Sequence, residues 1–151
     1  MKELGYLEHV GIFAHGVELN KREIAELTAS KIHIAHNPIS NLKLASGIAP
    51  VTDLIQAGVT VGLATDSVAS NNNLDMFEES RTAALLQKIR TGDATQFTIE
   101  QALKTMTIEG AKALGMDDQI GSLEVGKQAD FLIIQPKGKV YLYPEENMLS
   151  H

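Results

Sequence analysis

The feature that most constrains this chain is a strand, a polar loop and a helix that follow one another three times. Apolar runs at residues 10–14, 31–35 and 60–65 predict three short strands, and residues at helical spacing follow each of them. Short strands that are almost wholly apolar are typical of buried parallel sheets. The alternation with helices is typical of right-handed crossover connections. The sequence therefore predicts an α/β fold with a parallel sheet.

Three expected helices begin at residues that can cap a helix. Asn20, Asp75 and Thr98 each stand three positions before a Glu or Gln, which is the spacing of a capping box. They predict helices that begin directly after them, and we expect the second to run to about Arg90. The cap positions thus fix where most of the helical segments start.

The remaining segments are assigned from apolar spacing and turn residues. Residues 48–58 and 108–114 have helical spacing, whereas residues 38–46 and 67–74 are rich in turn-forming residues and are expected to be loops. Residues 121–136 contain two glycine turn signals and a β-rich run, which predicts a hairpin. The C-terminal third therefore departs from the repeated pattern.

A residue that can bind a metal or move a proton follows each predicted strand: His15, His36 and Asp66. Ligands of parallel α/β folds bind at the carboxyl ends of the strands, so we expect these side chains to converge on one rim. Each alone could simply cap a loop, but the coincidence favours a functional site. Asp66 is the strongest candidate, because a carboxylate that ends an apolar strand needs a cation or hydrogen bonds to balance its charge.

Other polar residues near these strand ends have simpler interpretations. His33 lies three positions before His36, so the period of two places it on the opposite face, and we expect a structural role. Residues 71–73 are expected to form a turn that bonds its own backbone. Glu78 and Glu79 are interpreted as acids in the first turn of a helix, where they favour the helix dipole.

The composition excludes several classes of function. The chain has no Cys, which rules out disulfides, thiolate metal sites and cysteine nucleophiles. Its formal net charge is −6 and it has no basic cluster, so we expect no binding to nucleic acid or to an anionic membrane. It has neither a secretory signal nor an apolar run of about 18 residues, so a cytoplasmic protein is expected.

Four segments resemble a known family: AHGVELN (14–20), AHNPISNLKLASGIAPV (35–51), VGLATDSVASNNNLDMFEE (61–79) and GSLEVGKQADFLIIQP (121–136). The first three resemble the sixth, seventh and eighth strand–loop segments of the amidohydrolase superfamily. Within it they are most similar to the 5-methylthioadenosine/S-adenosylhomocysteine deaminases. The fourth resembles the return of that family's chain into its small β domain.

The resemblance implies a particular fold. Residues 1–116 would form the C-terminal portion of a (β/α)8 TIM barrel of the metal-dependent hydrolase type, with strands six to eight and their helices. Residues 117–151 would begin the small composite β domain with a hairpin. A complete barrel needs about 250 residues. We therefore expect this sequence to be a piece of a longer enzyme, whose open sheet is covered by a missing half-barrel or by a second copy in a homo-oligomer.

The resemblance also implies the chemistry of the site. One divalent metal ion, usually Zn²⁺, would have Asp66 as a ligand, and Asp66 would also contact the substrate and take a proton from the attacking water. His15 would orient that water and stabilise developing charge, while His36 and Asn37 would shape the substrate site. The reaction would be hydrolysis of a C–N bond by metal-activated water, which deaminates an adenine nucleoside and releases ammonia.

The sequence departs from the family pattern in its metal ligands. It contains no His-x-His pair, because His33 and His36 are three apart, and it has no counterpart of the family's fifth-strand His. Two alternatives therefore stay open beside the deaminase. The chain alone could be a catalytically inactive fragment, or the enzyme could act on another small heterocycle such as guanine or a triazine.

Overall fold

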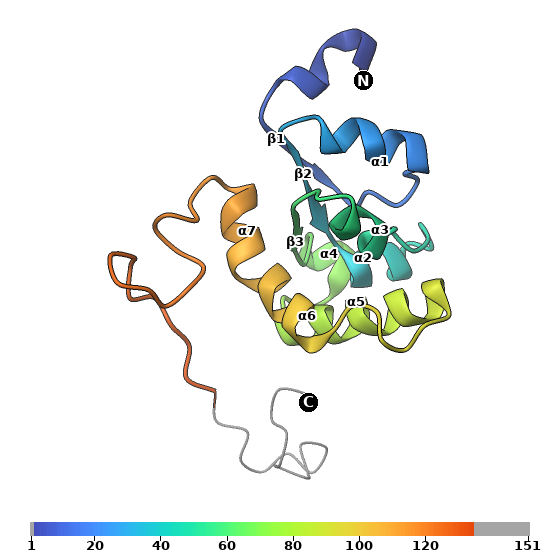
Figure 1. The fold of residues 1–151 in the computed structure, drawn as a ribbon. Coiled ribbons are helices and arrows are strands. Elements are labelled where there is room, and N and C mark those ends of the chain that lie inside the picture. Colours follow the sequence, from blue (N-terminus) through green and yellow to red (C-terminus); the bar gives the residue numbers. More distant parts are fainter. Residues whose placement is uncertain (1, 135–151) are drawn as a thin grey trace.

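The computed structural model describes residues 2–134 and contains the predicted parallel sheet (Figure 1). Its strands are β1 (Gly11–Ala14), β2 (Ile32–His36) and β3 (Val61–Leu63), and they lie in the order β1-β2-β3. Both pairs are parallel, with Phe13 opposite Ile34 and Ile34 opposite Val61. Because both pairs are parallel, the carboxyl ends of all three strands lie at one edge of the sheet.

Helices make up the other described elements. Two 3-10 helices precede β1: η1 (Lys2–Leu4) and η2 (Tyr6–Glu8). The crossovers contain α1 (Lys21–Thr28), α2 (Pro38–Lys43) and α3 (Val51–Gln56). The helices after β3 are α4 (Val68–Asn71), α5 (Met76–Thr91), α6 (Ile99–Met106) and α7 (Ile108–Ala113).

The helix starts expected from capping residues are confirmed. The Asn20 side chain accepts hydrogen bonds from the first turn of α1, and the Glu23 carboxylate accepts one from the backbone N–H of Asn20 at 2.9 Å. Thr98 and Gln101 form the same reciprocal pair at α6, and Asp75 caps α5. Each cap satisfies backbone N–H groups that have no partner within the helix.

Two predictions for the loops were wrong. Residues 38–46 contain α2, and residues 67–74 contain α4. Helices of six and four residues are too short to show a 3.6-residue period, and Pro38 begins α2 at the position where a missing N–H costs no hydrogen bond. The predicted hairpin is not confirmed, because no strand follows β3 within residues 2–134, and the rest of the predicted β domain lies outside the described residues.

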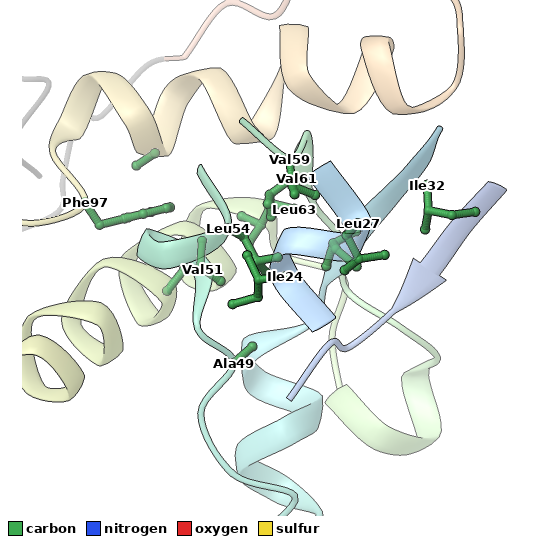
Figure 2. Close-up of a cluster of buried hydrophobic side chains, with 13 residues drawn as sticks. Ile24, Leu27, Ile32, Ala49, Val51, Leu54, Val59, Val61, Leu63 and Phe97 are labelled. Carbon is green, nitrogen blue, oxygen red and sulfur yellow. The ribbon is translucent and has the colours of Figure 1, made fainter. Parts of the chain in front are cut away.

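A single apolar layer fills the space between the sheet and the crossover helices (Figure 2). Ile24 and Leu27 of α1 pack there with Leu54 of α3 and Val61 of β3, and all four are buried. Phe97, just before α6, closes the layer on the side of α5 and is only 2% exposed. This layer holds the strands rigid and so fixes where their carboxyl ends lie.

The other face of β3 meets α7. Successive residues of a strand face opposite sides of the sheet, so Gly62 faces the side opposite to the side chains of Val61 and Leu63. A Cβ on Gly62 would lie 3.1 Å from the Cα of Gly110 in α7, so a larger side chain would push the helix away from the strand. Within residues 2–134, no helix has the length and apolar character needed to cross a bilayer.

Candidate active site

The carboxyl ends of the strands bring two of the three predicted side chains together. His15 follows β1 and Asp66 follows β3, and the Nε2 atom of His15 lies 3.9 Å from Oδ2 of Asp66. Both residues have a positive φ, 69° and 63°, which turns the chain sharply at the strand end. Residues other than Gly rarely adopt this conformation, so the local backbone is strained where the two side chains meet.

Two serines from different helices hold the Asp66 carboxylate. Ser40 Oγ of α2 donates to Oδ2 at 2.6 Å, and Ser70 Oγ of α4 donates to the same atom at 2.8 Å. The pKa of Asp66 lies below its usual value. The hydrogen bond from Ser40 is the largest cause, and the hydrogen bond from Ser70 is the second. The carboxylate therefore stays ionised, and its side chain remains 33% exposed at the rim.

The segment after β2 positions His15. The Asn37 side chain accepts a hydrogen bond from the backbone N–H of His15 at 3.2 Å, and Asn41 Oδ1 lies 2.9 Å from Nδ1 of the His15 ring. An amide oxygen only accepts, so Nδ1 donates, and in the neutral ring Nε2 is then the acceptor on the side of Asp66. Asn41 and Ser40 were not singled out from the sequence, although they follow Asn37 closely.

His36 lies differently from the other two strand-end residues. Its side chain is 1% exposed, on the same strand face as Ile34, and neither ring nitrogen has a hydrogen-bond partner within residues 2–134. Burial, and to a lesser extent the neighbouring His15, lowers the pKa of His36 to about 4. The ring is therefore neutral at pH 7. His33 lies on the opposite strand face, as its spacing predicted.

Sequence reasoning missed the role of Glu79. It is fully buried at the start of α5, where Oε2 accepts from the backbone N–H of Ile39 at 3.2 Å and Oε1 accepts from Nδ2 of Asn71. Asn71 Nδ2 also donates to the carbonyl of Thr65 at 2.7 Å. Burial raises the pKa of Glu79. Glu79 does lie in the first turn of α5, and Asn71 does accept a hydrogen bond from the nearby backbone N–H of Asn73, as expected. The sequence interpretation did not include the buried hydrogen bond between the two side chains.

The donors at the rim match part of a metal site. Asp66 offers a carboxylate oxygen of the kind that zinc binds, beside the imidazole of His15. No group of three or more His, Cys, Asp or Glu within residues 2–134 is placed to hold a metal ion. Asp66 therefore fits the role of one ligand, and the described residues do not make a complete set.

Comparison with known proteins identifies the family. The model of the amidohydrolase family matches residues 1–148. The chain belongs to the amidohydrolase family. A 5-methylthioadenosine/S-adenosylhomocysteine deaminase of Bacillus thuringiensis (strain Al Hakam) is 54% identical to it over 147 residues. That match covers 97% of this chain and 34% of the relative, so the chain spans about a third of the length of the curated relatives it matches.

Solved structures show the same fold. An adenosine deaminase from Xanthomonas campestris with bound zinc superimposes with a TM-score of 0.93 and 42% identity, covering 99% of this chain and 34% of that one. An atrazine chlorohydrolase from Arthrobacter aurescens, complexed with zinc, gives a TM-score of 0.79 and 30% identity over 85% of this chain and 29% of its own. The chain therefore has an amidohydrolase-type fold, in which a parallel sheet and its helices correspond to part of a TIM barrel.

Proposed function

We propose that this chain supplies the rim formed by strands six to eight of a metal-dependent aminohydrolase that deaminates an adenine nucleoside of the 5-methylthioadenosine/S-adenosylhomocysteine type. The observation that carries the proposal is the Asp66 carboxylate, held by two serines at a strand end beside His15. The 54% identity to a deaminase of that name supports the substrate class. In this proposal residues 1–116 belong to the barrel, residues 117–151 begin the small β domain, and the protein works in the cytoplasm.

Asp66 has two tasks in the proposed reaction. Its ionised carboxylate serves as one ligand of a divalent metal, for which zinc in related structures is the best guide. When bound, such a metal supplies the Lewis acidity that makes water a nucleophile near neutral pH. The carboxylate also accepts the proton of the attacking water. Hydrogen bonds from Ser40 and Ser70 to Oδ2 keep the group charged and fix its direction before the substrate arrives.

His15 orients the water and the substrate. Asn41 holds its ring through Nδ1, which leaves Nε2 directed to the region beside Asp66. From there it can accept a hydrogen bond from the water or, once protonated, donate to the oxygen that develops on the substrate. The Asn37 side chain supports His15 by accepting a hydrogen bond from the backbone N–H of His15, and we also assign it to the edge of the substrate site. We assign the neutral, buried ring of His36 to shaping that site.

A segment exchange tests the proposal. This chain replaces the matching 147 residues of the Bacillus thuringiensis relative, and ammonia release is measured with 5-methylthioadenosine and S-adenosylhomocysteine. We expect turnover of at least one of the two, its loss in Asp66→Ala, and its retention in Asp75→Asn, which alters a helix cap instead. A folded exchange protein that turns over neither nucleoside would contradict the proposal, and turnover of guanine or a triazine would favour the alternative substrates.

The 151-residue chain by itself is the second arm of this experiment. The described residues offer one metal ligand rather than a full set, so we expect no deamination by the isolated chain. Turnover by the isolated chain that is lost in Asp66→Ala would show instead that the chain or its oligomer completes the site.

A further inference from the structure

We propose that Glu79 is a positioning residue for Asp66, because its buried carboxylate joins the two helices whose serines hold Asp66. This inference rests on the proposed role of Asp66 and adds a residue to it. Glu79 lies on α5, is 0% exposed and has no hydrogen bond with Asp66 within residues 2–134, although the negative charge of Asp66 contributes to the raised pKa of Glu79. It acts through α2 and α4, each of which contributes one serine to the Asp66 carboxylate.

The first connection runs through α2. Oε2 of Glu79 accepts the backbone N–H of Ile39 at 3.2 Å, and the next residue, Ser40, donates its hydroxyl to Asp66 at 2.6 Å. Both Ser40 and Glu79 are 0% exposed, so water offers no substitute for either hydrogen bond. A shift of Ile39 relative to α5 would therefore move the donor of the shorter Asp66 hydrogen bond.

The second connection runs through α4. Asn71 donates to Oε1 of Glu79 and, through the same nitrogen, to the carbonyl of Thr65. Thr65 directly precedes Asp66, and Ser70, the other serine donor, directly precedes Asn71. This second connection thus reaches Asp66 in two ways: through the serine on α4 and through the backbone that follows β3.

A carboxylate is required for this arrangement, because both of its partners are donors. A Gln at position 79 has one oxygen and one NH2 group, so it would accept from either Ile39 or Asn71 and would place a donor against the other. Glu79→Gln keeps nearly the same volume. It therefore removes one connection without opening a cavity.

Gln87 provides a matched control on the same helix. It is also 0% exposed, and its amide bonds the backbone and hydroxyl of Thr52 and the carbonyl of Ala49. These partners lie before and within α3 and contribute nothing to the Asp66 carboxylate. Gln87→Ala leaves buried polar groups without partners, so it should lower stability without moving Asp66.

The test uses the full 151-residue chain without metal or substrate, and its readout is therefore independent of any deaminase activity. The NMR signals of the Asp66 carboxyl carbon and the His15 ring are compared, at one fixed pH, among the unchanged chain, Glu79→Gln and Gln87→Ala. We expect both signals to shift in Glu79→Gln by more than in Gln87→Ala, while the thermal midpoint falls in both variants. A third variant, Asn71→Ala, keeps the charge of Glu79, which by itself acts on Asp66, and removes the hydrogen bonds of the Asn71 side chain to Glu79 and to the carbonyl of Thr65. We expect it to shift the Asp66 signal as well, which separates positioning from the loss of a charge.

Two results would overturn the inference. One is a Glu79→Gln or Asn71→Ala protein that keeps its fold and leaves the Asp66 and His15 signals unmoved. The other is an equal shift in Gln87→Ala, which would mean that these signals report general loosening. If Glu79→Gln does not fold, Asn71→Ala decides the question alone. If the expected NMR shifts are observed but the segment-exchange protein shows no deamination, the result counts against the proposed function and not against the role of Glu79.

Discussion

The apolar layer beneath the strands and the polar rim at their carboxyl ends are held together in opposite ways. In the layer, Ile34, Leu54 and Val61 only need to exclude water, and their packing has no required direction. At the rim and directly beneath it, Ser40 and Glu79 are just as deeply buried but need specific partners, because a buried polar group without a hydrogen bond is costly. The apolar layer stabilises the fold. The hydrogen bonds at the rim fix the positions of its polar side chains.

The strongest test of this contrast is a cavity in the layer. Leu54 is 0% exposed, and Leu54→Ala should lower the free energy of unfolding by about 2–5 kcal/mol, from lost apolar burial and the space left behind. Urea denaturation measures the change. Leu85→Ala on the exposed side of α5, where the leucine is 55% exposed, should change stability far less. Equal losses in the two variants would mean that the layer is not what stabilises the fold.

The next largest effect is a pH dependence that comes from His36. Its pKa is about 4 in the folded chain against 6.5 ordinarily, so the unfolded chain binds more protons between these values and stability falls as pH falls from 6.5 to about 4. The loss attributable to this residue reaches up to about 3 kcal/mol.

Replacement of His36 checks this dependence. His36→Gln should flatten the slope of unfolding free energy against pH in that window. His9→Gln, at an exposed histidine, should leave the slope as it was. An unchanged slope in His36→Gln would show that another group causes the acid sensitivity.

Removing one rim hydroxyl should have a smaller effect on stability but a direct effect on Asp66. Ser40→Ala removes the foremost cause of the lowered pKa of Asp66, so that pKa should rise toward its usual value. Ser70→Ala should raise it less, and the double variant more than either. Carbon-detected NMR titration of the Asp66 carboxyl measures all three, and a pKa that does not respond to either serine would contradict the arrangement at the rim.

The smallest effect is expected at a surface ion pair that belongs to neither region. Arg90 Nη2 lies 2.6 Å from Asp53 Oδ2, and both side chains are partly exposed. Arg90→Ala should cost less than about 1 kcal/mol, and the cost should shrink in high salt. A loss as large as that of Leu54→Ala would mean that this pair joins α3 and α5 more strongly than its exposure suggests.

The same contrast explains which features could be predicted from the sequence. Apolar periodicity and caps such as Asn20 depend on neighbouring residues, so they located the strands and most helices correctly. The pairing of His15 with Asp66 followed from the rule that parallel strands end at one edge. Glu79 could not be found in this way, because its partners Ile39 and Asn71 lie 40 and 8 residues away, and its position also fits a helix-dipole acid. Helices α2 and α4 were missed because they are too short to show a period.

The proposed role of Asp66 as a metal ligand can be examined through the zinc content of the protein. The Bacillus thuringiensis relative that carries this chain in place of its own matching segment is purified, and its zinc is measured by elemental analysis, with Asp66→Ala and Asp75→Asn as paired variants. We expect about one zinc per chain, a large loss in Asp66→Ala and no loss in Asp75→Asn. If a folded Asp66→Ala protein kept its full zinc content, Asp66 would not be a metal ligand.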